Sequence, residues 1–159
     1  MKILGIVLVI TSAIFFSYER NKRTEKSLET LEEIFRFIEH VKIKIGCYLA
    51  PVSVLSSDFV SDILSVREFL SDFSHLGPLS AYKRLEEKTR FPEDARRVLQ
   101  RFFASLGRGY ADDEITLIEK TLSDLSKIIV TEREKSKNEK KLTLTLSTAG
   151  ALALIILLV

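Results

Sequence analysis

The chain begins and ends in apolar sequence, and this feature constrains its fold more than any other. Residues 142–159 read LTLTLSTAGALALIILLV and contain no charged residue. As an α-helix these residues span roughly 27 Å, which is close to the hydrocarbon thickness of a bilayer. We therefore predict a C-terminal transmembrane helix over residues 142–159, and a buried core helix is the alternative.

Residues 1–18 form the second apolar end, which contains the run ILGIVLVITSAIFF. A cleaved signal peptide is the alternative to a membrane anchor. However, the small residues at 11–13 lie inside the apolar run rather than after it, and the basic cluster follows the run instead of preceding it. We therefore predict an uncleaved N-terminal transmembrane anchor over residues 1–18.

Basic residues lie on the inner side of both apolar ends. Lys and Arg near the ends of membrane spans favour the cytoplasmic side, so we predict a cytosolic domain over residues 19–141 between two spans. We also expect these residues to contact the anionic membrane surface; the alternative is that they only set the topology. They form what we call the basic collar: Arg20, Lys22, Arg23, Lys26, Arg133, Lys135, Lys137, Lys140 and Lys141.

Apolar residues in the middle of the chain recur at steps of three and four, which is typical of amphipathic helices. One stripe covers residues 28–45 and another covers residues 115–129. We predict that the first helix continues the N-terminal span and ends before Pro51. The second should run through the basic collar into the C-terminal span.

Four shorter helices are predicted between the two long ones, over residues 51–56, 59–73, 78–88 and 92–106. Pro78 and Pro92 suit a first helical turn, where a missing N–H costs nothing, and Gly107 suits the end of a helix. No stretch alternates as a strand does. We therefore predict an all-α fold, an antiparallel bundle of about six cytosolic helices flanked by N- and C-terminal transmembrane helices.

The composition argues against several function classes. The 159 residues include one Cys and two His, and the net charge is +2. A disulfide framework and a structural zinc site need more of these residues, and a nucleic-acid-binding domain is usually strongly basic. The chain also lacks a phosphate-binding glycine loop. We expect no enzyme activity, cofactor, metal ion or nucleic-acid partner; a lipid-modifying enzyme that uses isolated carboxylates is an alternative.

The segment LGRGYADDE at residues 106–114 is a second candidate site, which we call the docking corner. Two glycines favour a tight turn, and carboxylates that follow them favour the start of a helix. We interpret the segment as a partner-docking corner; the alternative is an ordinary helix end followed by a helix start. The candidate docking residues are Leu106, Gly107, Gly109, Asp112 and Asp113.

The sequence resembles the stage III sporulation protein AB family of endospore-forming bacteria over essentially the whole chain. The resemblance rests on KILGIVLV at the N-terminus, the segment LETLEEIFRFIEHVKIKIGCYLAPVSVL, the pair Ala81-Tyr82, the LGRGYADDE corner and the apolar tail behind a Lys-rich stretch. The chain departs from the family pattern at Tyr82, where the family tends toward Trp.

The resemblance implies a cytosolic helical bundle similar to the type II F domains of secretion-platform membrane proteins. It implies a non-enzymatic platform or assembly component of the secretion-like channel between mother cell and forespore. The implied partners are a cytosolic secretion-type ATPase and other membrane proteins of that channel. We therefore expect the protein in the mother-cell membrane that faces the forespore. The alternative is a general inner-membrane assembly component of a type II secretion or type IV pilus-like apparatus.

Overall fold

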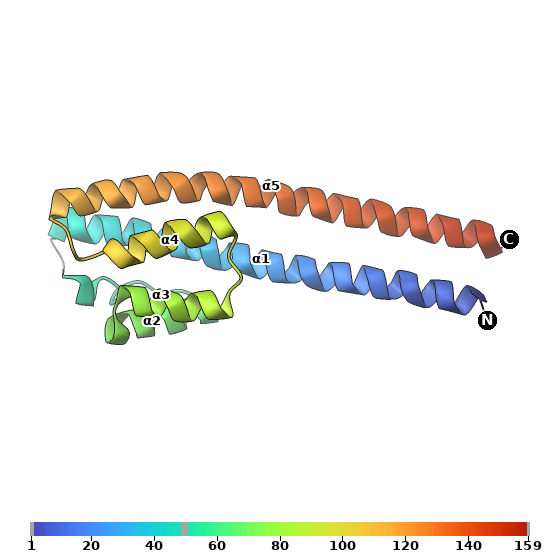
Figure 1. Ribbon diagram of the computed structural model, residues 1–159, viewed down its shortest axis with the longest axis horizontal. Coiled ribbons are helices and arrows are strands. Elements are labelled where there is room, and N and C mark those ends of the chain that lie inside the picture. The colour runs from blue at the N-terminus through green and yellow to red at the C-terminus, as the bar shows by residue number, and fades with distance from the viewer. Residues whose placement is uncertain (1, 49–50, 159) are drawn as a thin grey trace. The chain divides into compact units, whose positions relative to one another are not determined.

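The computed structural model describes the backbone of residues 2–48 and 51–158 (Figure 1). Most side chains of residues 1–20 and 147–159, and a few others, lie outside the described part. The chain divides into two compact units: unit 1 contains residues 1–26 and 132–159, and unit 2 contains residues 27–131. The elements are α1 (Lys2–Tyr48), the 3-10 turn η1 (Val52–Val54), α2 (Leu64–Leu76), α3 (Pro78–Lys88), α4 (Glu93–Ser105) and α5 (Ala111–Leu158).

The all-α prediction is confirmed, since the described residues form helices and no strand. The two long helices contain 47 residues in α1 and 48 residues in α5. Each one joins a predicted amphipathic stripe to an apolar end without a break, as the sequence predicts. α1 ends at Tyr48, in agreement with the helix-breaking effect expected of Pro51.

The predicted transmembrane helices fall on residues 1–18 and 142–159, where the described backbone is helical. Most of the side chains in these two stretches lie outside the described residues. Among the residues that are described, no helix offers a stretch both long enough and apolar enough to cross a membrane. The two spans stay predictions.

Aromatic side chains form the centre of unit 2. The ring of Phe37, in α1, lies edge-on to two rings of α2, with centroids 5.5 Å from Phe69 and 5.3 Å from Phe73. Phe103 of α4 lies 5.4 Å from Phe69 and stacks on Tyr82 of α3 at 5.2 Å. Edge-on and stacked rings attract each other beyond the gain from burial alone. The surrounding buried residues include Leu31, Ile34, Ile38, Val41, Leu99, Phe102, Ile118 and Leu125.

Tyr82 shows how this core accommodates a polar group. Its ring is fully buried, and its hydroxyl donates a hydrogen bond to the backbone oxygen of Arg96 at 3.2 Å. Burial, followed by the nearby charge of Glu86, raises the pKa of Tyr82 well above its usual value. The hydroxyl therefore stays protonated and acts as a donor that fixes α3 against α4.

Within unit 2, α1 and α5 run in opposite directions. Lys42 Nζ lies 2.8 Å from Glu119 Oε1, and a Cβ atom at Gly46 would lie 3.9 Å from Ile115 Cδ1. Moving forward by one turn along α1 therefore corresponds to moving back by one turn along α5. This agrees with the predicted antiparallel arrangement of the first and last helices.

The structure corrects the predicted helices over residues 51–56 and 59–73. The first is only the three-residue turn η1, and the second begins later, at Leu64 of α2. The segment from 55 to 63, which we call the strap, has no α-helix. The described residues therefore form five α-helices rather than a bundle of about six.

Small polar residues explain why the strap is not helical. Ser57 Oγ donates to the backbone oxygen of Val54 at 2.8 Å, and the N–H of Ile63 donates to Ser61 Oγ at 3.2 Å. Hydrogen bonds of this kind offer the backbone an alternative to helical pairing. The apolar periodicity of this segment is helix-like, but its local polar contacts favour an irregular path.

The strap is fixed to α1 by a ring contact and an ion pair. Phe59 lies 5.5 Å from Phe37 and 5.6 Å from His40, measured between ring centroids, and Asp58 pairs with Lys44. The hydrogen bond from Lys44, together with its charge, lowers the pKa of Asp58. Burial and the charge of Lys44 lower the pKa of His40. The imidazole is therefore neutral near pH 7, and its buried Nε2 has no hydrogen-bond partner within the described residues.

The helices α2, α3 and α4 pack as successive neighbours. The turn between α2 and α3 contains Gly77 with φ +83°, a conformation that favours glycine, and Pro78 then begins α3. The predicted helices over residues 78–88 and 92–106 are confirmed as α3 and α4, the latter one residue shorter at each end.

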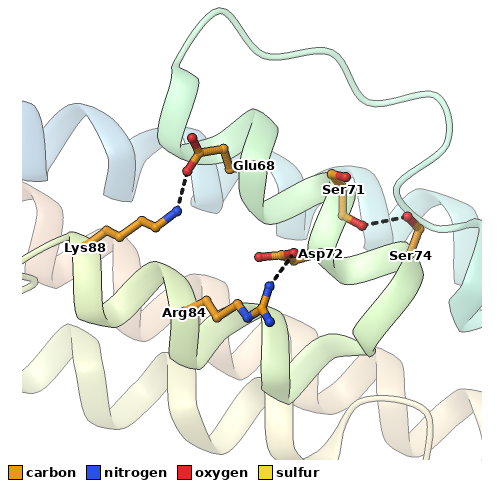
Figure 2. A network of polar contacts seen from close by, with 6 residues as sticks. All are labelled: Glu68, Ser71, Asp72, Ser74, Arg84 and Lys88. Atoms are coloured by element: carbon orange, nitrogen blue, oxygen red, sulfur yellow. Dashed lines mark hydrogen bonds and ion pairs between the residues drawn. The ribbon is translucent and has the colours of Figure 1, made fainter.

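Two ion pairs join the exposed sides of α2 and α3, as Figure 2 shows. Arg84 Nη1 lies 3.1 Å from Asp72 Oδ1, and Lys88 Nζ lies 2.6 Å from Glu68 Oε2. Both pairs are partly exposed, so each contributes about 0–1 kcal/mol to stability. They add a small contribution to the packing of two helices that already share the aromatic core.

Candidate functional site

The docking corner lies where α4 passes into α5. α4 ends at Ser105 and α5 begins at Ala111, so all five candidate docking residues lie in the connection or in the first turn of α5. Leu106 is buried and belongs to the core of unit 2. The structure therefore brings the predicted residues together but gives them different roles.

Gly107 shapes the corner. Its φ is +81°, and a Cβ atom there would lie 2.6 Å from Cγ2 of Val52 in η1. Both facts require glycine, because side chains rarely adopt this backbone conformation and because no space is left for another carbon atom. Gly107 therefore has the helix-ending role that the sequence left as the alternative. Gly109 differs, since a Cβ atom there would make only ordinary contacts, the nearest at 3.5 Å from the Cβ of Asp113.

Glu114 fixes the corner, although it is not one of the five candidate docking residues. Its side chain is buried in the first turn of α5, and its Oε1 accepts the backbone N–H of Gly107 at 2.6 Å. A bond to a charged acceptor is stronger than one between neutral groups. The only sequence signal is an acidic residue at a helix start, which Asp112 and Asp113 share.

The remaining residues of the corner form its outer surface. Tyr110 is 85% exposed, and Arg108, Gly109, Asp112 and Asp113 are exposed beside it. The carboxylates belong to the first turn of α5, where the helix dipole favours negative charge. An exposed tyrosine beside two carboxylates, on a turn held by the Gly107–Glu114 bond, is a surface suited to protein contact.

The basic collar lies on both long helices within unit 1. The side chain of Arg20 lies outside the described residues. Arg23 pairs with Glu19 at 2.7 Å, Lys135 pairs with Glu132 at 2.6 Å, and Lys140 of α5 pairs with Glu25 of α1. Lys22, Lys137 and Lys141 are exposed, and Lys26 and Arg133 have polar interactions of their own. The structure therefore brings the two halves of the collar together in one unit.

These two surfaces offer charge pairing, hydrogen bonding and aromatic contact. The docking corner offers the carboxylates of Asp112 and Asp113, and the collar offers ammonium and guanidinium groups. Within the described part of the chain, no group of three or more His, Cys, Asp and Glu residues is arranged to hold a metal ion.

Comparison with protein-family models matches the stage III sporulation protein AB family over residues 79–159, just over half of the chain. The matched region contains nearly all of α3, all of α4 and α5, and the docking corner. Comparisons with curated proteins and with solved structures give no significant match. The resemblance seen in the sequence is thus confirmed over residues 79–159, and the chain belongs to the stage III sporulation protein AB family, as a structural component of sporulation stage III.

Proposed function

We propose that this protein is a non-enzymatic membrane platform in the secretion-like channel between mother cell and forespore. In this proposal it couples a cytosolic ATPase to the membrane proteins of the channel. Residues 1–18 and 142–159 insert into the mother-cell membrane that faces the forespore, and residues 19–141 lie in the cytoplasm. The basis is family membership together with the apolar ends of the sequence.

The observation that supports this proposal most is the continuity of α1 and α5. Each helix extends from the core of unit 2 to an apolar end of the chain without interruption. A helix is a stiffer connection than a flexible linker. Two unbroken helices can therefore transmit a displacement from the bundle to the membrane, which a disordered tether would absorb.

The docking corner supplies the surface for the ATPase in this proposal. Tyr110, Asp112 and Asp113 project from a turn that the Gly107–Glu114 bond already holds in place. A fixed surface loses less conformational entropy on binding than a mobile loop does. The exposed aromatic ring and carboxylates then favour a partner surface that combines an apolar contact with basic side chains.

The basic collar supplies the contact with the membrane surface. A Lys or Arg residue near an anionic leaflet contributes on the order of 1 kcal/mol to binding. Unit 1 contains ten Lys and Arg residues against five acidic residues, so the net charge stays positive despite the ion pairs within it. This charge favours attachment to the cytoplasmic leaflet.

The test combines three substitutions in the docking corner: Tyr110→Ala, Asp112→Ala and Asp113→Ala. Co-purification of the ATPase with the variant from sporulating cells should fall about tenfold, because the variant lacks the aromatic and charged contacts. The helical circular dichroism should not change, since all three side chains are exposed. Glu87→Ala with Asp124→Ala is the control, because it removes two carboxylates from α3 and α5 outside the corner.

Identification of the captured proteins separates the proposal from its alternative. Sporulation-channel proteins among them support the proposed role, whereas pilus-assembly proteins support a general assembly component. Wild-type recovery of the ATPase by the triple variant would show that the docking corner is not its binding surface.

A further inference from the structure

The short turn η1 packs against the docking corner. A Cβ atom at Gly107 would lie 2.6 Å from Cγ2 of Val52, so η1 and the connection between α4 and α5 are in direct contact. Gly46, near the end of α1, lies beside Ile115, near the start of α5. The connection that follows α1 and the connection that precedes α5 therefore meet at one end of unit 2 (Figure 1).

η1 turns one side toward the corner and the other side toward solvent. Side chains three residues apart lie on the same side of a 3-10 turn, and the backbone N–H of Val54 donates to the oxygen of Pro51 at 3.0 Å. Val52 and Leu55 form the inner side, because Val52 contacts the corner and Leu55 is fully buried. Pro51 and Val54 form the outer side, and both are exposed. η1 therefore presents apolar side chains to solvent.

Contacts on two sides hold η1 in place. Val52 packs on the corner, and Ser57 Oγ donates to the backbone oxygen of Val54 at 2.8 Å. The next residue, Asp58, pairs with Lys44 of α1. The turn is thus held between the corner and α1 before any partner binds, so binding costs little conformational entropy.

Charged and apolar side chains are separated between the two segments. Residues 51–57, which contain η1, include no charged residue. The corner exposes Arg108, Asp112 and Asp113, which make no ion pair within the described part of the chain. Two carboxylates against one guanidinium group leave a net negative charge. A surface with carboxylates on one half and apolar side chains on the other fits a partner segment that is basic and amphipathic.

One partner segment can reach both halves of this surface. Val54 lies two residues and Tyr110 lies three residues from the contact between Val52 and Gly107, so their Cα atoms are no more than about 25 Å apart. About seven extended residues, or a helix of about 17 residues, cover that distance. Tyr110 is 85% exposed and adds an aromatic side chain on the corner.

We propose that the ATPase docks across η1 and the corner together, with apolar side chains on Pro51 and Val54 and basic side chains on the corner carboxylates. This inference rests on the proposed function and extends it, since η1 contains none of the candidate docking residues. The occupant is the ATPase rather than the membrane, because the exposed carboxylates repel an anionic lipid surface. A partner bound there contacts the connections of both long helices, so its displacement reaches α1 and α5 at the same time.

The first test removes the apolar side of η1. In the η1 variant, Pro51→Ser is combined with Val54→Ser, and recovery of the ATPase with the protein from sporulating cells should fall about tenfold. Both side chains are exposed, so the fold should be kept. Circular dichroism verifies that the variant is folded.

Leu64→Ser with Val130→Ser is the matched control, because it removes two exposed apolar side chains far from η1. Leu64 adjoins Ser65, whose hydroxyl hydrogen-bonds with that of Thr30, and Thr30 lies about 27 Å from the end of α1. Val130 lies about five turns along α5 from the docking corner. The control should keep wild-type recovery of the ATPase.

A photocrosslinking residue tests the contact directly and keeps the rest of η1 intact. Placed at position 54 or 110 it should capture the ATPase, and placed at position 130 it should not. If the η1 variant keeps wild-type recovery while the triple variant of the docking corner loses it, the ATPase binds the corner alone, and this inference fails although the proposed function stands. Wild-type recovery by both variants would reject the corner as well. Capture of a second copy of this chain from position 54, and not of the ATPase, would also overturn the inference.

Discussion

The helices α1 and α5 contribute to both compact units, but with different chemistry in each. In unit 2, α1 buries Leu31, Phe37 and Val41 in the same core as Ile118 and Leu125 of α5. In unit 1, a described contact between the two helices is the partly exposed ion pair of Glu25 with Lys140. Apolar burial contributes about 25 cal/mol per Å², whereas an exposed ion pair contributes about 0–1 kcal/mol. Among the contacts of the described residues, those in unit 2 therefore contribute most to the stability of the fold in water.

The two units also differ in net charge. Unit 1 has twice as many basic as acidic residues, whereas unit 2 has seventeen acidic and fourteen basic residues. The excess of positive charge is therefore confined to the unit that contains the apolar ends. This distribution is the one expected if unit 1, and not unit 2, lies against anionic lipid.

Phe37→Ala should have the largest effect. The substitution removes the ring that contacts Phe59, Phe69 and Phe73, and loss of a buried Phe side chain costs about 3–5 kcal/mol. Phe15→Ala in unit 1 makes the same chemical change at a side chain that is 69% exposed, and it should cost less than about 0.5 kcal/mol in water. Urea unfolding followed by circular dichroism measures both. Equal losses would show that unit 2 is not the main source of stability.

Gly107→Ala should have the next largest effect, about 2–4 kcal/mol. It places a side chain in an unfavourable backbone conformation and also forces it against Val52. Gly77→Ala has the same positive φ with open space around the added carbon, so it should cost about 1–2 kcal/mol.

Val52→Ala separates the two causes. Combined with Gly107→Ala it should recover the part of the loss caused by the clash, and combined with Gly77→Ala it should recover nothing. Thermal unfolding of the single and double variants gives the comparison. If Val52→Ala has the same effect in both backgrounds, the close approach of η1 to the corner is not important for stability.

Loss of either ion pair between α1 and α5 should have the smallest effect. Lys42→Ala removes the pair with Glu119 in unit 2, and Lys140→Ala removes the pair with Glu25 in unit 1. Both pairs are exposed, so each substitution should cost about 0.2–1 kcal/mol, less at high salt. The measurement is urea unfolding at low and at high salt. A loss above about 2 kcal/mol for Lys140→Ala alone would show that unit 1 depends on its ion pair.

Much of the fold can be predicted from local signals in the sequence. Apolar residues at helical spacing predict the two long helices, and Pro78 marks the start of α3 at the correct residue. The strap is wrongly predicted to be helical, because its apolar residues have helical spacing. Its path depends on contacts that no local pattern reveals, namely the ring of Phe59 on Phe37 and the hydrogen bonds of the nearby serines.

The sequence predicts the position of the candidate site correctly, but it does not predict the role of each residue in it. Asp112 and Asp113 are exposed, as a docking role requires, but Leu106 is a core residue and Gly107 is required by its backbone conformation. The contact that constrains Gly107 comes from Val52, which is distant in sequence. Two glycines in the sequence predict a tight turn. The contact of Val52 with that turn depends on the tertiary fold and cannot be predicted from a local pattern.

Because α1 and α5 share the core of unit 2, the protein can finish folding only after α5 has been synthesised. The apolar stripe of α1 leaves the ribosome early, but the residues of α5 that complete its cover are translated many codons later. Until Leu125 has been made, residues 31–45 are only partly covered and are open to aggregation or to chaperones. An mRNA truncated before the codon for Leu125 would therefore yield an aggregation-prone fragment, even though most of the core residues would already be present.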